Sequence, residues 1–247
     1  MKAIILAGGY DQIALIQELK KRGFETILID YYENPPAKNF ADNHYQVSTL
    51  DIEAIKKIAI KENVHLVTTA CTDQALLSIA KVSEELVLPC YIPYKKALNV
   101  TNKKYMKNVM NKSGIPTAKH KVVSDIKSID LSEFKFPIVV KPTDCNSSKG
   151  VQKGFNAKEG VQRIKEAIDL SRSKTAIVEE YIEGFEISLD AFISDGKAEV
   201  LLITRSEKIK NSTGFTIVQS RFPVDLDHKI IKKRSEEHTS ELQSPRT

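Results

Sequence analysis

Through the first third of the chain, short apolar runs alternate with longer segments in which apolar residues recur at helical spacing. Residues 3–7 and 26–29 are apolar runs of strand length, and glycine or acidic positions follow them. The segment between the two runs repeats its apolar residues at helical spacing: Ile13, Leu15, Ile16 and Leu19. Because a strand, a helix and a second strand follow one another, the pattern predicts a parallel sheet with a right-handed crossover.

The same alternation continues to residue 82. Residues 64–69 form a third apolar run, and helices are expected from Asp51 and over 73–82. The turn at Gly8-Gly9, with Asp30 after the second run, also invites a dinucleotide-binding interpretation in which Asp30 binds a ribose. The glycines do not follow G-x-G-x-x-G, however, so a plain strand–helix turn is the favoured interpretation.

The remainder of the chain mixes helices with strands and hairpin signals. A helix is predicted over 102–113, and another begins at Asn156, where Glu159 completes a capping-box pattern. Residues Asp195-Gly196 are a two-residue turn signal between two apolar strands. The segments predicted as strands are 121–123, 138–140, 175–181, 186–193, 197–205 and 215–220. The predicted class is therefore α/β in the first part and α+β in the second.

The most distinctive segment is 136–151, F-P-I-V-V-K-P-T-D-C-N-S-S-K-G-V. Its β-branched run predicts a buried strand with Lys141 at its end, where Pro142 lacks the N–H that a ladder needs. Small polar residues follow, and Lys149 and Gly150 close the loop. Hydroxyls, backbone amides and two ammonium groups in one small volume suit a polyphosphate, and an ordinary polar turn is an equal alternative. A Walker loop is excluded, because G-x-x-x-x-G-K-[ST] occurs nowhere in the sequence.

Composition removes several functional classes. The 247 residues are 41% hydrophobic and 28% charged, which is typical of a globular protein. A net charge of +5 with interleaved signs does not indicate a nucleic-acid surface. No apolar run reaches membrane-spanning length, and three cysteines without metal-ligand spacing fit a reducing compartment. The sequence therefore predicts a cytoplasmic protein with neither nucleic-acid nor membrane partners.

Residues 234–247 differ in character from the rest of the chain. They have almost no apolar content, and they resemble the translation of a sequencing adapter. We therefore exclude this tail from the fold as non-native and expect the natural sequence to be cut off near Lys233. A disordered polar tail is the alternative, and it predicts the same lack of structure.

Three motifs occur in a fixed order. Asn102-Lys103 opens the helix that ends at G-I-P, V-V-K-P-x-D-x-x-S-S-K-G-V follows, and V-E-E-Y-I-E-G-F-E occupies 178–186. Together they resemble the ATP-grasp superfamily of carboxylate–amine ligases, and most of all its purine-biosynthetic and carbamoyl-phosphate-synthase-like branches. The resemblance implies a Rossmann-like pre-ATP-grasp domain over 1–95 and an incomplete ATP-grasp domain over 96–233.

The resemblance also implies which residues hold the triphosphate. Lys103 and Lys141 would reach the ATP phosphates as point charges, although Asn102 stands where the family usually has Asp. A flexible loop would close over the triphosphate and exclude water. Its residues expected to contact ATP are Ser147, Ser148 and Gly150.

In the family, a linker strand holds the adenine and the ribose. Its counterparts here are Glu179, Glu180, Tyr181 and Ile182. Successive strand residues face opposite sides, so only one of the two glutamates is expected to point its carboxylate at the nucleotide, and the sequence leaves open which one. Ile182 would supply a backbone N–H and an apolar wall, and Glu186 matches the acid that binds the ribose hydroxyls.

The family's reaction is phosphoryl transfer from ATP to a substrate carboxylate, which gives an acyl phosphate for attack by an amine or similar nucleophile. Two Mg²⁺ ions neutralise charge on the transferring group. No Glu…Glu-x-Asn set lies between Val200 and Lys233, so no metal ligand and no catalytic residue is assigned in this chain. The Mg²⁺ ligands are expected in a missing C-terminal part, and the chain itself is expected to show weak or no turnover.

Two other functions stay open at this stage. One is a nucleotide-binding module or sensor without ligase chemistry. The other is a dinucleotide-dependent oxidoreductase built on residues 1–90, against which the broken glycine pattern argues. The sequence sets neither the identity of the carboxylate and the nucleophile nor whether the chain forms a homo-oligomer.

Overall fold

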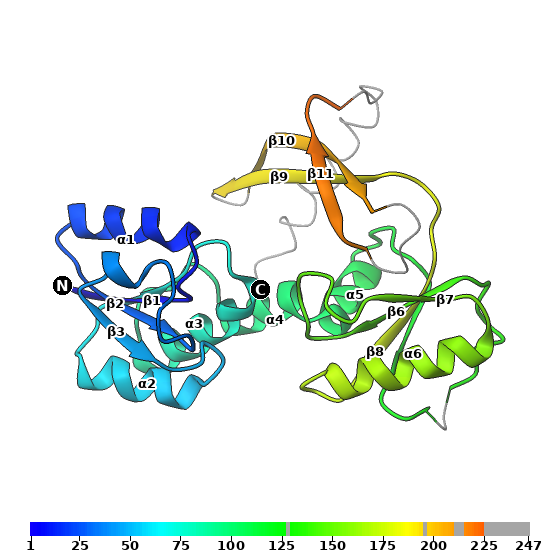
Figure 1. Cartoon of the computed structure of the whole chain (residues 1–247), viewed down its shortest axis with the longest axis horizontal. Coiled ribbons are helices and arrows are strands. Elements are labelled where there is room, and N and C mark those ends of the chain that lie inside the picture. The colour runs from blue at the N-terminus through cyan, green and yellow to red at the C-terminus, as the bar shows by residue number, and fades with distance from the viewer. Residues whose placement is uncertain (127–128, 195–196, 210–214, 225–247) are drawn as a thin grey trace. The chain divides into compact units, whose positions relative to one another are not determined.

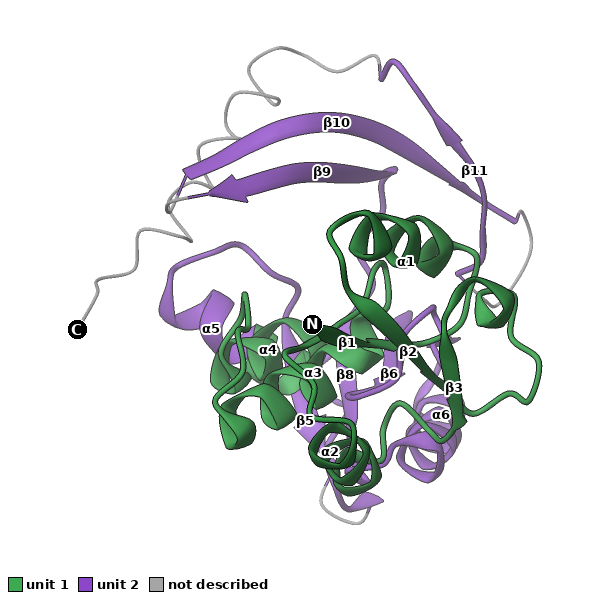
Figure 2. Cartoon of the chain, turned by 90° about the vertical axis from the view of Figure 1, so that its left-hand side faces the viewer, with its two compact units in different colours: residues 1–106 green, residues 107–247 purple. Residues whose placement is uncertain are grey.

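The computed structural model describes residues 1–126, 129–194, 197–209 and 215–224. The chain divides into two compact units, Met1–Met106 and Lys107–Thr247 (Figure 2). This division falls inside helix α5 (Lys103–Lys112). The domain boundary expected at residue 95 stays a prediction.

The first unit is a four-stranded parallel sheet of order β3-β2-β1-β4 with helices on both faces (Figure 1). Its strands are β1 (Lys2–Leu6), β2 (Glu25–Asp30), β3 (Asn43–Gln46) and β4 (Leu66–Thr68). Its helices are α1 (Asp11–Lys21), η1 (Lys38–Phe40), α2 (Ile52–Lys61), α3 (Asp73–Leu86) and α4 (Tyr94–Thr101). The predicted Rossmann-like parallel sheet is confirmed.

Side-chain alternation along these strands builds two cores. One set of strand residues packs with Ile55 of α2 and Ile79 of α3: Ile4, Leu6, Ile27 and Ile29. The alternate set packs with Ile16 of α1: Ala3, Ile5 and Leu28. Because both faces are covered, β1 and β2 are apolar along most of their length, which explains why continuous apolar runs predicted them.

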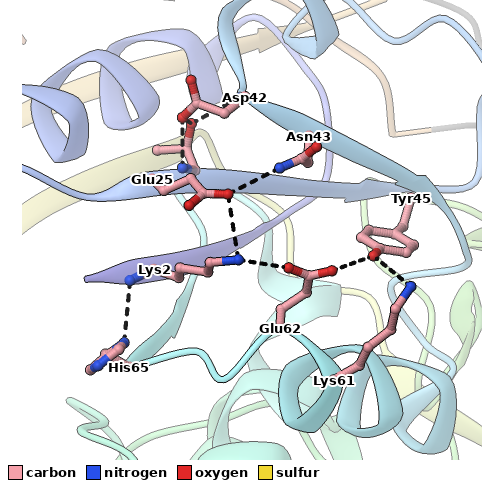
Figure 3. A network of polar contacts seen from close by, with 9 residues as sticks. Lys2, Glu25, Asp42, Asn43, Tyr45, Lys61, Glu62 and His65 are labelled. Carbon is pink, nitrogen blue, oxygen red and sulfur yellow. Dashed lines mark hydrogen bonds and ion pairs between the residues drawn. The ribbon is translucent and has the colours of Figure 1, made fainter.

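An ion network joins the amino ends of β1 and β2 to the end of α2 (Figure 3). Lys2 Nζ lies 2.9 Å from a carboxylate oxygen of Glu62 and 3.5 Å from one of Glu25. The Tyr45 hydroxyl donates to the other Glu62 oxygen at 2.5 Å and accepts from Lys61 Nζ at 3.2 Å. Hydrogen bonds from Tyr45 and Lys2 hold the pKa of the Glu62 carboxyl below its ordinary value. The network thus links two strands of the sheet to α2, at the end of the sheet opposite Gly8.

The second unit contains two antiparallel sheets. The first has the order β5-β8-β6-β7 and consists of β5 (His120–Val123), β6 (Ile138–Pro142), β7 (Gln152–Gly154) and β8 (Ala176–Glu180). The second has the order β11-β10-β9 and consists of β9 (Glu186–Ser194), β10 (Lys197–Lys208) and β11 (Ile217–Arg221). Helix α6 (Ala157–Leu170) packs on the first sheet (Figure 1).

The pairing of Lys197 with Ser194 confirms the predicted hairpin. Its turn residues Asp195-Gly196 lie outside the described residues, as does the tail expected at 234–247. Strand β10 runs three residues beyond the predicted end at Arg205. Among the helices of the described residues, none has both the length and the apolar character needed to cross a membrane.

Two predicted helix caps are confirmed. Asp51 accepts a hydrogen bond from the Ala54 N–H at 3.0 Å and starts α2. Asn156 accepts from the Glu159 N–H at 3.0 Å and starts α6, and the Glu159 carboxylate accepts in return from the Phe155 N–H at 3.1 Å. The return bond thus goes one residue before the cap, and the pattern still identifies the helix start.

Candidate functional site

The two faces of the β5-β8-β6-β7 sheet have different characters. One face packs on Ile164 of α6 through a set of apolar residues: Ile138, Val140, Ala176 and Val178. Because successive strand residues point to opposite sides, Lys141 and Glu179 lie on the other face. In the ladder, Glu179 is opposite His120 of β5 and Val139 of β6, and Lys153 of β7 is opposite Val139. One row of this face therefore carries a carboxylate, an imidazole and an ammonium group.

Glu179 is a buried carboxylate held between two lysines. Its two oxygens lie 2.5 Å from Lys141 Nζ and 3.0 Å from Lys107 Nζ. Lys107 also donates to the Thr117 hydroxyl at 2.5 Å. The exposed fractions of the side chains are 7% for Glu179, 12% for Lys107 and 26% for Lys141. Two positive charges and one negative charge share this place, and Lys141 is the more accessible lysine.

The charges decide the protonation of Glu179. Burial acts to raise the pKa of the Glu179 carboxyl, but Lys141 and Lys107 outweigh it and hold that pKa below its ordinary value. The carboxylate is therefore ionised at neutral pH, and the group of three charges is left with one surplus positive charge.

The structure separates the two glutamates that the sequence left undecided. Glu179 lies on the lysine-bearing face, whereas a carboxylate oxygen of Glu180 accepts from the Lys119 N–H at 3.1 Å. The next residues continue beyond the strand: Lys153 Nζ lies 3.7 Å from the centre of the Tyr181 ring, and the Ile182 side chain is exposed. Glu179 is thus the glutamate that shares a face with Lys141.

The start of the 143–151 loop is fixed by polar contacts. The Asp144 carboxylate accepts from the Arg172 N–H at 3.2 Å and from the Ser173 N–H at 2.7 Å. The buried Thr143 hydroxyl lies 2.6 Å from that of Thr175. These contacts attach the loop to the segment between α6 and β8, directly beside the end of β6.

The tip of the loop has an unusual backbone. Ser147 and Ser148 are exposed and adopt left-handed φ angles of 53° and 57°, which cost about 1–2 kcal/mol for each residue. Gly150 has φ 74°, and a Cβ atom there would lie 2.8 Å from both Pro142 and Leu170. Only glycine fits where the loop passes so close to the end of β6.

The remaining predicted ATP contacts lie on two further elements. Glu186 is the first residue of β9, and its carboxylate lies 2.6 Å from Lys208 Nζ of β10. Lys208 in turn lies 5.0 Å from the centre of the Phe215 ring. Lys103 is the first residue of α5, and Lys107, one turn later, is the residue of this helix paired with Glu179. The nucleotide contact expected of Lys103 stays a prediction.

In the first unit, Asp30 has a structural role. Its carboxylate accepts from the Gly8 N–H at 2.7 Å and from the Tyr32 N–H at 2.8 Å. A Cβ atom at Gly8 would lie 2.4 Å from Pro35. These contacts favour the plain strand–helix turn over ribose binding by Asp30, because both carboxylate oxygens already close the turn.

Lys107 and Lys153 are site residues that the sequence patterns missed. Lys107 follows Lys103 by four residues, a spacing that places both on one side of a helix and that could have suggested it. Lys153 lies in a strand of only three residues, which gave no periodic signal. Within the described residues, no group of three or more His, Cys, Asp or Glu side chains is placed to hold a metal ion.

Family models match both parts of the chain. Residues 101–212 match the phosphoribosylglycinamide synthetase ATP-grasp (A) domain, and residues 4–88 match the PylC-like N-terminal domain. The second match begins in β1 and covers the parallel sheet, and the first covers the sheet that carries Lys141 and Glu179.

Individual proteins show the same relationship. A formate-dependent phosphoribosylglycinamide formyltransferase of Sulfurisphaera tokodaii is 28% identical over 248 residues, which are 95% of this chain and 61% of that protein. The crystal structure of phosphoribosylglycinamide synthetase from Anaerococcus prevotii has a TM-score of 0.68 at 25% identity, covering 98% of this chain and 61% of that one. The L-amino acid ligase of Bacillus licheniformis shares the fold, with a TM-score of 0.78 at 18% identity and coverages of 98% and 59%.

The chain thus spans less than two thirds of the length of each of these proteins. The motif order, the lysine–glutamate face and the two domain matches agree with one another. On these grounds the chain is a member of the ATP-grasp superfamily.

Proposed function

We propose that this chain carries the nucleotide-binding part of an ATP-dependent ligase that forms a bond between a carboxylate and an amine or similar nucleophile. The observation that supports this most is the buried Glu179 between Lys141 and Lys107, on the sheet face that α6 leaves open. The surplus positive charge there suits an anionic ligand. The 143–151 loop begins at the same strand end as Lys141 and adds hydroxyls and backbone amides.

Each part of ATP has a proposed partner. Lys141, the more accessible of the two paired lysines, binds the phosphates, and the loop with Ser147, Ser148 and Gly150 closes over them and excludes water. The ionised Glu179 accepts from the adenine amine. Backbone groups of the Glu180–Ile182 linker and the exposed Ile182 side chain complete the base site.

The proposed partner of the ribose is already paired with a lysine. Glu186 accepts from the ribose hydroxyls in our proposal, and its carboxylate is paired with Lys208 at 2.6 Å in the structure. Because 46% of the Glu186 side chain is exposed, the sugar can share this carboxylate with Lys208 without displacing a buried group.

The chemistry in the whole protein would be transfer of the ATP γ-phosphoryl group to a substrate carboxylate. The acyl phosphate so formed is attacked by the nucleophile, and phosphate leaves. ATP-grasp reactions use Mg²⁺. The described residues offer it no ligand set, so no step is assigned to the ion, and its ligands are proposed to lie outside these residues.

Names of similar proteins suggest which substrates to test first. Formate and phosphoribosylglycinamide occur in the name of the Sulfurisphaera relative, and phosphoribosylglycinamide also occurs in that of the Anaerococcus synthetase. We therefore propose a small carboxylate as the group that is phosphorylated and an amine on a phosphoribosyl compound as the nucleophile.

The test is ATP binding by calorimetry to the 247-residue chain and to Lys141→Ala. We expect Lys141→Ala to weaken ATP binding by about 10- to 100-fold, because a charge-assisted bond to phosphate is lost. Lys121→Ala is the matched control, since Lys121 lies on β5 of the same sheet and pairs with Glu133 at 2.7 Å. Equal affinities of the chain and Lys141→Ala for ATP would refute the placement of the site.

A second measurement separates the ligase from the alternative of a nucleotide-binding module. The whole protein is incubated with ATP, a small carboxylate and an amine, and the release of ADP is measured. ADP release that depends on both compounds supports the ligase. ATP binding without such release favours the module.

A further inference from the structure

Lys107 is largely, although not fully, buried where α5 meets the charged face of the sheet. Its ammonium contacts the Glu179 carboxylate at 3.0 Å and the Thr117 hydroxyl at 2.5 Å, and 12% of its side chain is exposed. Lys104, on the same helix, is exposed to solvent. An ammonium group loses several kcal/mol of hydration on burial, so a lysine kept in such a place must be paired. Lys107 is therefore fixed in the structure, and its charge is directed at Glu179.

The charge balance at Glu179 determines what Lys141 can do. With Lys107 present, the carboxylate shares its negative charge between two ammonium groups, one on each oxygen. Without Lys107, Lys141 and Glu179 would form a pair of zero net charge in a partly buried place. The carboxylate would then compete more strongly with any phosphate for the Lys141 ammonium.

We propose that Lys107 is a positioning residue of the nucleotide site: it neutralises and orients Glu179, and so leaves the charge of Lys141 available to a nucleoside triphosphate. In this proposal Lys107 acts on Glu179 and does not contact the nucleotide; its observed partners are Glu179 and Thr117. The inference deepens the proposed function and rests on it.

Other groups face Glu179 and must be accounted for. His120 lies opposite it on β5, Lys141 contacts it from β6, and Lys107 reaches it from α5. Lys153 is in the same row of the ladder on β7. Because an imidazole and two further ammonium groups face the same carboxylate, the test follows the Glu179 carboxyl itself instead of a global signal.

The first experiment needs no nucleotide. The carboxyl ¹³C signal of Glu179 is titrated by NMR in the 247-residue chain, in Lys107→Met and in Lys107→Arg. We expect the midpoint to rise in Lys107→Met and to return towards the original value in Lys107→Arg, which keeps the charge. Lys104→Met removes the same charge from an exposed position of α5 and should leave the midpoint unchanged. An unchanged midpoint in Lys107→Met would overturn the inference.

The second experiment is a double-mutant cycle on the ATP dissociation constant. Lys107→Met should weaken binding by about tenfold, with recovery in Lys107→Arg. In the Glu179→Gln background there is no carboxylate to neutralise, so the same substitution should change binding by less than about twofold. An equal loss in both backgrounds would mean that Lys107 binds the nucleotide directly, and it would overturn the positioning role.

The two experiments distinguish a failure of the proposed ATP binding from a failure of the role proposed for Lys107. Absence of ATP binding to the unaltered chain would overturn the proposed function and, with it, the nucleotide part of this inference. The titration of Glu179 still decides whether Lys107 sets the charge of that carboxylate. If Glu179→Gln does not fold, the comparison of Lys107→Met with Lys107→Arg decides between charge and packing.

Discussion

Replacing Glu179 with Gln should destabilise the second unit strongly, although the two side chains have almost the same shape. The Glu179 side chain is 7% exposed, and its oxygens lie 2.5 Å from Lys141 Nζ and 3.0 Å from Lys107 Nζ. The amide keeps one acceptor oxygen, but its NH₂ group faces an ammonium group. Two lysines are then left in a partly buried place without a counter-charge.

The expected magnitude follows from this burial. Removal of one partner from a buried ion pair costs about 3–5 kcal/mol. Lys141 retains some contact with water, with 26% of its side chain exposed, so the lower end of that range, about 3 kcal/mol, is appropriate. For a unit of this size the loss corresponds to a decrease of about 10 °C in the melting temperature.

The assay is calorimetric unfolding near neutral pH, with Glu180→Gln as the matched control. Glu180 is the next residue, and its carboxylate accepts one hydrogen bond, from the Lys119 N–H, which Gln can also accept. A control effect within about 0.5 kcal/mol is expected. If Glu179→Gln and Glu180→Gln unfold at the same temperature, the two lysines do not depend on Glu179 and the reasoning is refuted.

The same substitution makes a prediction about pH. The folded-state pKa of Glu179 lies below its ordinary value of 4.5, so its contribution to stability is complete above that value. The contribution is lost as the pH falls through the folded-state pKa. The difference in melting temperature between the chain and Glu179→Gln should therefore be constant near neutrality and decrease in acid.

Two further substitutions test the loop and the first unit. Gly150→Ala should lower the free energy of unfolding, measured by urea titration, by about 2 kcal/mol, because φ at this position is 74° and the added Cβ would lie 2.8 Å from Pro142. Gly9→Ala is its control and should have little effect in the same titration, since no atom lies near the added Cβ. Glu62→Gln should lower the melting temperature above the ordinary carboxyl pKa of 4.5 and converge with the original chain in acid, since Tyr45 and Lys2 hold its pKa down. A difference that grows in acid would contradict this, and the exposed Glu33→Gln is its control.

Much of the fold could be predicted because its signals are local. Strands β1, β2 and β4 of the first unit lie in apolar runs, and Asp51 and Asn156 cap their helices through their own side chains. The two missed strands lack such signals. Strand β3 reads N-H-Y-Q and β7 reads Q-K-G, so neither has an apolar run, and each exists because a longer neighbouring strand pairs with it.

The candidate site could be predicted only in part, for a related reason. Lys141 and the loop after it are adjacent in sequence, so one segment revealed them. The pairing of Glu179 with Lys107 joins residues 72 positions apart and depends on how α5 approaches the sheet. The choice between Glu179 and Glu180 depends on which side of β8 faces α6. Because both residues are glutamate, the sequence alone does not indicate which of them lies on that side.

The two adjacent glutamates have one more consequence, which concerns changes in the length of β8. A one-residue deletion in β8 before Glu179 would bring Glu180 beside Lys141 and would keep a carboxylate there. It would also turn Glu179 into the apolar cluster that contains Ile164 and Ala167 of α6, where burial of a charge is costly. The packing against α6 therefore protects the alignment of the acid with its lysines, and a length change in β8 should abolish folding before it alters nucleotide preference.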